Sequence, residues 1–190
     1  MIRVLRFQDV TVMPWKNGQG ETREICKSGD LQGEYDWRIS VATISQSGPF
    51  SRFDGYLRNI SVLEGGGMHL DIDGQPRALI RPFCATDFSG ASQVYCRVID
   101  GPLLDFNVIY RADSFRATVN WSDLAEWHYE GGTRLLLNAG ASLTVYSAGE
   151  QFLLQRYDCL LTDGEEVLSV SDFPGTSFAR VTLSEISHSQ

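Results

Sequence analysis

Hydrophobic and polar residues alternate along most of this chain in short runs with a period of two residues. Gly, Pro, Asn or Asp separates the runs about every 8 to 12 residues, and stretches with a helical period are almost absent. The pattern is typical of an all-β protein built as an antiparallel sandwich or barrel. Helical turns are expected only near Trp121–Glu126 and within the first thirty residues. The predicted strands are Trp37–Ile44, Arg58–Leu63, Met68–Ile72, Arg77–Ile80, Val94–Ile99, Leu104–Tyr110, Phe115–Asn120, Thr133–Leu137, Ser142–Tyr146, Gln151–Leu154, Cys159–Leu161, Glu166–Val170 and Ser177–Ser184.

The chain also contains an internal repeat. When the sequence is shifted by 74 positions, Ile60–Gly90 matches Arg134–Gly164 without a gap, and Phe83 falls on Tyr157. Apolar and turn positions agree although few residues are identical, which indicates two similar β-sandwich or barrel halves. We expect both halves to belong to one globular unit. The two predicted domains are 1–112, which holds the expected pocket, and 113–190.

Composition narrows the class of protein and its partners. Of the 190 residues, 43% are hydrophobic and 21% are charged, and 16 basic against 24 acidic residues give a net charge of −8. Without a basic cluster, nucleic acid and anionic membranes are poor partners. No apolar window reaches the roughly 18 residues of a membrane span, and no secretory segment is evident. The four cysteines form no CxxC pair, so we expect reduced, mostly buried thiols in a cytoplasmic protein.

One stretch, Gly48–Gly65, resembles the first metal-binding motif of the cupins, H-x-H-x(3,4)-E on a strand that ends at a turn glycine. With the turn aligned on Gly65, Arg58 takes the glutamate position. Gln93 takes the histidine position of the second cupin motif. The first two histidine positions fall on Arg52 and Asp54, or with the longer spacing on Ser51 and Phe53.

Other residues therefore occupy every metal-ligand position of the motif. A first-row metal needs converging imidazole or carboxylate ligands, so we expect neither a metal nor another cofactor. Arg58 places a fixed positive charge where the cation would lie. A guanidinium group holds a carboxylate through two parallel hydrogen bonds, and the pattern thus predicts a pocket for a small anion.

Longer motifs make the resemblance more specific. Pro14–Glu24 contains W-K-N-x-x-G-x-T-x-E, a signature of the HutD/Ves family, and further matches follow at Trp37–Ile44, Gly48–Gly55, Arg58–Gly65 and Asp105–Val108. Together these blocks cover residues from about 7 to 111, and the chain resembles this family closely. The resemblance implies a bicupin found with bacterial histidine-utilisation genes. It also implies an accessory or regulatory factor that binds small molecules and has no established catalytic activity.

Strand alternation predicts which polar side chains converge in the first barrel. Arg38 and Ser40 share a face of one strand, Asp105 and Asn107 share a face of another, and Arg58 lies on a third. No catalytic residue or metal ligand is assigned. The candidate ligand-binding residues are Trp15, Asn17, Arg38, Ser40, Phe50, Phe53, Arg58, Gln93, Asp105 and Asn107.

Several of these side chains also have a purely structural interpretation. Arg58 and Asp105 could form a buried ion pair that closes the barrel, and Arg38 could extend its guanidinium group to the surface. Phe50 and Phe53 could belong to the hydrophobic core. These alternatives stay open at the level of the sequence.

The favoured function is non-catalytic binding of a small carboxylate metabolite, in a regulatory or governor role for histidine utilisation. With the family resemblance, the expected ligand is a pathway intermediate such as urocanate or formylglutamate. One alternative is a metal-free enzyme of the isomerase or hydrolase type with Asp105 or Glu64 as the base. Another is a protein-interaction module with a vestigial pocket. A homodimer formed through an exposed β edge is also left open.

Overall fold

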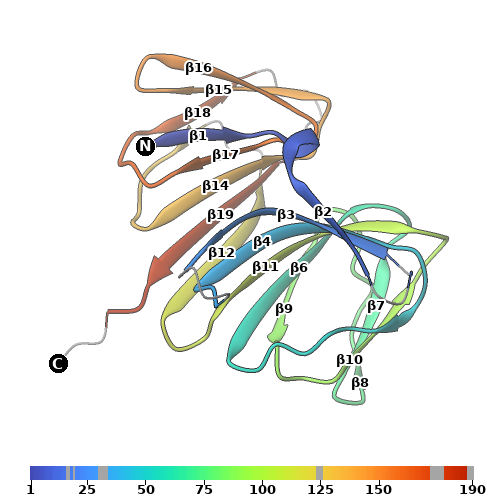
Figure 1. Ribbon diagram of the computed structural model, residues 1–190. Helices are drawn as coiled ribbons and strands as arrows, with labels where there is room; N and C mark the ends of the chain where they lie inside the picture. Colours follow the sequence, from blue (N-terminus) through green and yellow to red (C-terminus); the bar gives the residue numbers. More distant parts are fainter. Residues whose placement is uncertain (16–17, 19, 30–33, 123–125, 172–177, 188–190) are drawn as a thin grey trace. The chain divides into compact units, whose positions relative to one another are not determined.

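The computed structural model describes residues 1–190 except 16–17, 19, 30–33, 123–125, 172–177 and 188–190. In the described residues almost all regular structure is β-strand, and the one helix is a 3-10 turn at Phe7–Asp9 (Figure 1). The all-β prediction is therefore confirmed. No helix among the described residues has the length and apolar character needed to cross a membrane.

The chain divides into two compact units. One consists of Thr11–Arg116, and the other combines Met1–Val10 with Ala117–Gln190. The first ten residues go with the C-terminal part because strand β1 (Ile2–Leu5) pairs antiparallel with strand β17 (Cys159–Thr162). The division expected from the sequence, 1–112 and 113–190, assigned residues 1–10 to the N-terminal half. These residues lie outside the repeat, so the repeat gave no sign of their pairing with β17.

The first unit, Thr11–Arg116, contains two sheets. One has the strand order β2-β3-β4-β11-β6-β9 and the other β5-β10-β7-β8. Apolar side chains from both sheets, among them Ile60, Val62 and Leu70, form one buried core, so the sheets face each other. The strands are β2 (Thr11–Pro14), β3 (Gly20–Ser28), β4 (Trp37–Ile44), β5 (Gly48–Pro49), β6 (Tyr56–Glu64), β7 (Met68–Ile72), β8 (Gln75–Pro76), β9 (Ala85–Ser89), β10 (Val94–Val98) and β11 (Leu103–Arg111).

The second unit repeats this plan. Its sheets have the orders β1-β17-β14-β19-β12 and β13-β18-β15-β16, and Leu136, Leu160 and Val145 belong to the core that both sheets share. Ile2 and Val4 of β1 pack against that core. The remaining strands are β12 (Phe115–Ser122), β13 (Glu126–Trp127), β14 (Thr133–Asn138), β15 (Ser142–Ser147), β16 (Glu150–Gln155), β18 (Leu168–Ser171) and β19 (Phe178–Glu185).

The internal repeat of the sequence is a repeat of the structure. A shift of 74 residues carries β6, β7 and β9 onto β14, β15 and β17. The backbone repeats as well, because Phe83 and its counterpart Tyr157 both adopt left-handed conformations, with φ of 63° and 66°. Non-glycine residues rarely adopt such φ values, so their recurrence at matched positions supports a duplicated supersecondary unit.

The first thirty residues differ most from the prediction. Their described residues form β1, β2 and β3, and in this described part the helical turns expected from the sequence reduce to the 3-10 turn Phe7–Asp9. Strand β3 carries Glu, Arg and Lys, which have good intrinsic helix propensity. Pairing with β2 on one side and β4 on the other holds it extended, so tertiary contacts decide its conformation.

Two other local predictions were wrong or fall partly outside the described residues. Arg77–Ile80 is no continuous strand, because β8 ends at Pro76 and Ile80 joins Met68 through an isolated bridge. At the helical turn expected for Trp121–Glu126, Trp121 belongs to β12 and Glu126 to β13, while 123–125 lie outside the described residues. In contrast, Trp37–Ile44 and Met68–Ile72 match β4 and β7 at both ends.

All four cysteines are free thiols, as expected. Cys96 and Cys159 are buried, Cys26 is half-buried and Cys84 is exposed. The prediction of mostly buried thiols is therefore correct for two of the four cysteines.

Candidate anion-binding site

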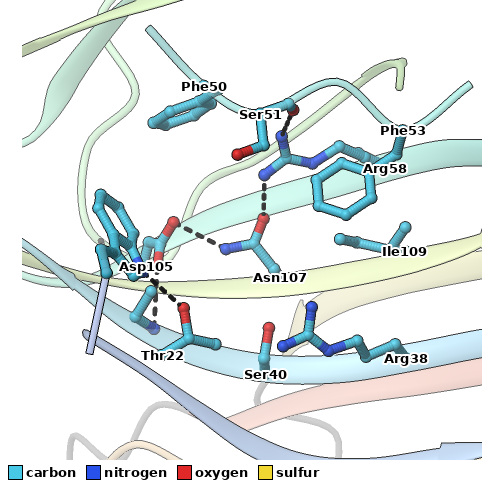
Figure 2. A pocket seen from close by; sticks show the side chains of 12 residues that line it. Thr22, Arg38, Ser40, Phe50, Ser51, Phe53, Arg58, Asp105, Asn107 and Ile109 are labelled. Atoms are coloured by element: carbon cyan, nitrogen blue, oxygen red, sulfur yellow. Dashed lines mark hydrogen bonds between the residues drawn. The ribbon is translucent and has the colours of Figure 1, made fainter. Parts of the chain in front are cut away.

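A cavity of about 100 Å³ lies in the first unit (Figure 2). Strands β4, β11 and β6, which are adjacent in the larger sheet, supply its polar floor. The segment between β5 and β6 closes it from the other side with two phenylalanines. The lining residues are Trp15, Thr22, Arg38, Ser40, Ala42, Phe50, Ser51, Phe53, Arg58, Asp105, Asn107 and Ile109.

Strand geometry explains why these side chains meet. Alternate residues of a strand point to the same face, so Asp105, Asn107 and Ile109 of β11 all reach the cavity. Ile109 pairs with Arg38 of β4 on one side and with Arg58 of β6 on the other. The two arginines therefore lie at the same level on either side of the central strand (Figure 2).

Arg58 is the most deeply placed cation of the cavity, with 6% of its surface exposed. Its Nη2 donates to Asn107 Oδ1 at 2.7 Å, and Nη1 makes a long contact of 3.5 Å with the Ser51 carbonyl oxygen. Burial lowers the pKa of Arg58 to about 10, so the side chain stays charged at neutral pH. Its guanidinium carbon lies 5.0 to 5.3 Å from the ring centroids of Phe50, Phe53 and Phe88.

Asp105 is connected to Arg58 through Asn107. One Asp105 oxygen accepts from Asn107 Nδ2 at 2.8 Å, and the other accepts from the Ala42 backbone N–H at 3.1 Å. These bonds fix the Asn107 amide with its oxygen toward Arg58. The predicted alternative of a direct Arg58–Asp105 ion pair does not occur among the described residues, since the neutral amide lies between the charges. Burial raises the pKa of Asp105 to about 6, although Asn107 and Arg58 oppose the rise.

Arg38 stays at the cavity wall. Its side chain is 16% exposed, and its Nε donates to Glu24 Oε2 at 2.9 Å. Glu24 also pairs with the half-exposed Lys27, whose Nζ lies 3.2 Å from the other carboxylate oxygen. The alternative in which Arg38 extends to the surface is therefore wrong, and one cavity cation already has a carboxylate partner.

Most predicted site residues come together here, although their role in binding stays a prediction. Gln93 lies outside the cavity, in a surface groove with Asp71 and Tyr95. Asn17 falls outside the described residues, and Glu64 is exposed at the end of β6. Eight predicted residues line the cavity: Trp15, Arg38, Ser40, Phe50, Phe53, Arg58, Asp105 and Asn107.

Four lining residues were missed. Ala42 and Ile109 share a face with Arg38 and Asp105, so strand alternation was the signal that could have found them. Thr22 lies on β3, which the sequence did not predict as a strand, and it accepts a hydrogen bond of 2.8 Å from the Trp15 indole. Ser51 was named only as one of two alignments of the cupin motif.

The donor set does not fit a divalent metal ion. Of the two alignments of the cupin motif, the longer spacing brings Ser51 and Phe53 to the cavity, whereas Arg52 and Asp54 are exposed and pair with each other at 2.9 Å. The described residues contain no group of three or more His, Cys, Asp or Glu side chains that could hold a metal. Glu24 already balances Arg38, so the cation that favours an anion is Arg58, whose side-chain partner is a neutral amide.

Each unit has a pair of facing antiparallel sheets, an internal repeat relates the two units, and the first unit encloses a polar cavity, which together define a bicupin. The fold agrees with that of a mutant of Bacillus subtilis oxalate decarboxylase, at a TM-score of 0.68 and 7% identity over 96% of this chain and 77% of that one. Within this class, the chain belongs to the HutD family, whose model matches residues 7–176.

Individual relatives agree with this assignment. An uncharacterised 21.2 kDa protein from the hutC 3′ region of Pseudomonas putida is 44% identical over 170 residues, 88% of this chain and 90% of the relative. HutD from Pseudomonas fluorescens, solved in a formate condition, has a TM-score of 0.86 and 36% identity over 98% of this chain and all of that one. A conserved Pseudomonas aeruginosa protein of unknown function has a TM-score of 0.90 and 38% identity, covering 97% and 99%. These relatives connect the chain with the histidine-utilisation locus.

Proposed function

We propose that this protein is a non-catalytic binding protein for a small carboxylate metabolite, with a regulatory or governor role in bacterial histidine utilisation. The observation that carries the proposal is Arg58, a buried cation that reaches a cavity and whose side-chain partner is the neutral amide of Asn107. A buried charge without a direct counter-charge is costly. A bound carboxylate would supply that counter-charge and two parallel hydrogen bonds.

Cavity size and the family connection narrow the ligand. A volume of about 100 Å³ accommodates a carboxyl group with a few further atoms, so the cavity would hold the carboxyl end of a larger ligand. Asn107 contacts Arg58, and Ser40 pairs with Asn107 on the neighbouring strand, so both would bind further polar atoms of the ligand. With the relation to the histidine-utilisation locus, an intermediate such as urocanate or formylglutamate is the ligand we propose.

Thermal stability in the presence of pathway intermediates tests this function. A ligand at about 100 times its Kd stabilises the folded state by roughly 2.7 kcal/mol, which raises Tm by about 5 to 10 °C for a chain of this size. We expect such a shift with one intermediate for the wild type and its loss in Arg58→Gln. Arg52→Gln is the matched control, because it removes the same charge from a side chain that is 55% exposed and lies outside the cavity.

The opposite results are equally informative. An unchanged shift in Arg58→Gln would place the site elsewhere. No shift with any intermediate would contradict carboxylate binding and favour a protein-interaction module with a vestigial pocket.

A metal-free enzyme is the second candidate, and Asp105 is the observation that favours it. Its carboxyl group lines the cavity with a pKa of about 6, a value that suits a general base near neutral pH. Product formation from an intermediate by the wild type, lost in Asp105→Asn with ligand binding retained, would support catalysis. An intermediate that binds and stays unchanged over long incubation would exclude its turnover at this site.

A further inference from the structure

The cavity holds a second buried charge close to the proposed ligand. We propose that the site binds the carboxyl group of its ligand together with one proton, which the ligand and Asp105 share. This proposal presupposes that a carboxylate binds near Arg58, and so rests on the proposed function. What it adds is the chemical form of the bound group, a hydrogen-bond acceptor and a donor side by side.

The first step is that the carboxyl group of the ligand and that of Asp105 would occupy the same small cavity. Arg58 and Asp105 line the same cavity of about 100 Å³, and Asn107 alone connects them, with hydrogen bonds of 2.7 and 2.8 Å. A carboxylate bound to Arg58 therefore enters a small buried volume that already contains the Asp105 carboxylate (Figure 2). Two carboxylates in such a site repel each other, and one of them retains a proton.

The second step is the count of charges around Asp105. Strand β6 contributes Arg58, and β4 contributes Arg38, whose charge Glu24 of β3 balances in an ion pair. Strand β10 contributes Cys96, whose thiol stays neutral because burial raises its pKa to about 12. With Asp105 ionised, the buried charges of Arg58, Arg38, Glu24 and Asp105 cancel, and Lys27, the other partner of Glu24, is half exposed and screened by solvent. A ligand carboxylate adds one negative charge, and one proton restores neutrality.

The third step is the state of Asp105 before binding. With a pKa of about 6, most Asp105 side chains are ionised at neutral pH, so the proton is taken up from solution when the ligand binds. A primary amide differs from a carboxylate in this respect. Its carbonyl oxygen can accept from Arg58 while its N–H donates to ionised Asp105, and no proton is needed.

Acetate and acetamide, which have the same shape, test the proposal on the full-length protein. Calorimetric titrations between pH 6 and 8, in buffers of different ionisation enthalpy, give the affinity and the number of protons taken up. For acetate we expect nearly one proton per ligand at pH 7. Its affinity should fall about 50-fold from pH 6 to 8, because only the protonated fraction of Asp105 is competent to bind. The affinity for acetamide, which needs ionised Asp105, should rise by only about two-fold over this range, without proton uptake.

Two variants assign the proton. Asp105→Asn should bind acetate with an affinity that no longer depends on pH, whereas the control Asp54→Asn, which removes an exposed carboxylate outside the cavity, should keep the wild-type dependence. The wild-type proton count alone decides the question if Asp105→Asn fails to fold. Acetate binding without proton uptake would overturn the shared proton and leave the proposed function intact. If neither acetate nor any pathway intermediate binds, the proposed function fails, and the shared proton with it.

Discussion

Two buried arginines differ in how many of their N–H groups already have hydrogen-bond acceptors within the protein. Arg134 is fully buried, and its Nη1 and Nη2 donate to the carbonyl oxygens of Trp127, Gly164 and Glu166 at 2.6 to 3.1 Å. Arg58 is buried to a similar degree but has one short bond, to Asn107. Backbone carbonyl groups elsewhere in the chain thus use the Nη donors of Arg134, while Arg58 keeps N–H groups that can donate to a ligand.

The pH dependence of stability is a prediction at the same scale. Burial raises the pKa of Asp105 from 3.8 to about 6 in the folded protein, so the folded state holds this proton more tightly than the unfolded chain. Its contribution to stability is fully present below about pH 4 and is lost as the pH rises through 6. The difference in pKa corresponds to roughly 3 kcal/mol.

Urea denaturation across this range measures the effect. The free energy of unfolding of Asp105→Asn, relative to wild type, should rise by roughly 3 kcal/mol between pH 4 and 7 and then level off. Asp54→Asn is the exposed control and should show no such rise. A difference between Asp105→Asn and wild type that is constant with pH would contradict the raised pKa.

Among the elements, β1 shows how a short strand joins a distant part of the chain. It pairs with β17, and the turn after it is held by Asp158 at the start of that strand. Asp158 accepts from the Phe7 N–H at 2.9 Å, from Arg6 Nη1 at 2.6 Å and from the Gln155 N–H at 3.0 Å. One buried carboxylate thus satisfies donors from two segments.

Replacement of that carboxylate should be costly. Asp158→Ala leaves a charged and two backbone donors without their partner, so we expect the free energy of unfolding to fall by about 2 to 4 kcal/mol. Asp54→Ala removes an exposed ion pair and should change it by less than about 0.5 kcal/mol. Equal effects of the two substitutions in urea denaturation would mean that Asp158 does not anchor the N-terminal segment.

At the scale of the whole molecule, the repeat has produced two halves with different interiors. Both have two facing sheets and a buried arginine on corresponding strands, Arg58 on β6 and Arg134 on β14. In the first unit the arginine reaches a cavity. In the second unit the guanidinium group of Arg134, which the 74-residue shift matches to Ile60, already donates to three backbone carbonyl groups. We therefore expect one ligand site per chain.

The stoichiometry of binding checks this expectation. Calorimetric titration with the intermediate that stabilises the protein should give one ligand per chain. Arg134→Gln should lower the stability of the fold without changing the ligand's Kd, whereas Arg58→Gln should abolish binding. Two equivalent ligands per chain, or a weaker Kd in Arg134→Gln, would show that the second half also binds the ligand.

Much of this architecture follows from local patterns in the sequence. The alternation of apolar and polar residues predicted both the first and the last residue of β4 and of β7. The 74-residue repeat predicted the two halves. Both signals are local, because strand periodicity and turn residues are properties of short segments. Alternation also put Asp105 and Asn107 on one face and Arg38 and Ser40 on another. The replaced metal ligands pointed to Arg58, which lines the cavity, and its role in anion binding stays a prediction.

Only the tertiary structure decided how these residues are connected. Charged β3 is a strand because its neighbours pair with it, and β1 belongs to the second unit because it pairs with β17. The amide of Asn107 separates Arg58 from Asp105, which no spacing along the chain could reveal. Burial then sets the charge state of Asp105, since desolvation depends on all the strands around it. The sequence by itself determined most strands after residue 36, the repeat and the candidate residues, and long-range pairing and burial decided the remaining strands, the partners of these residues and their chemistry.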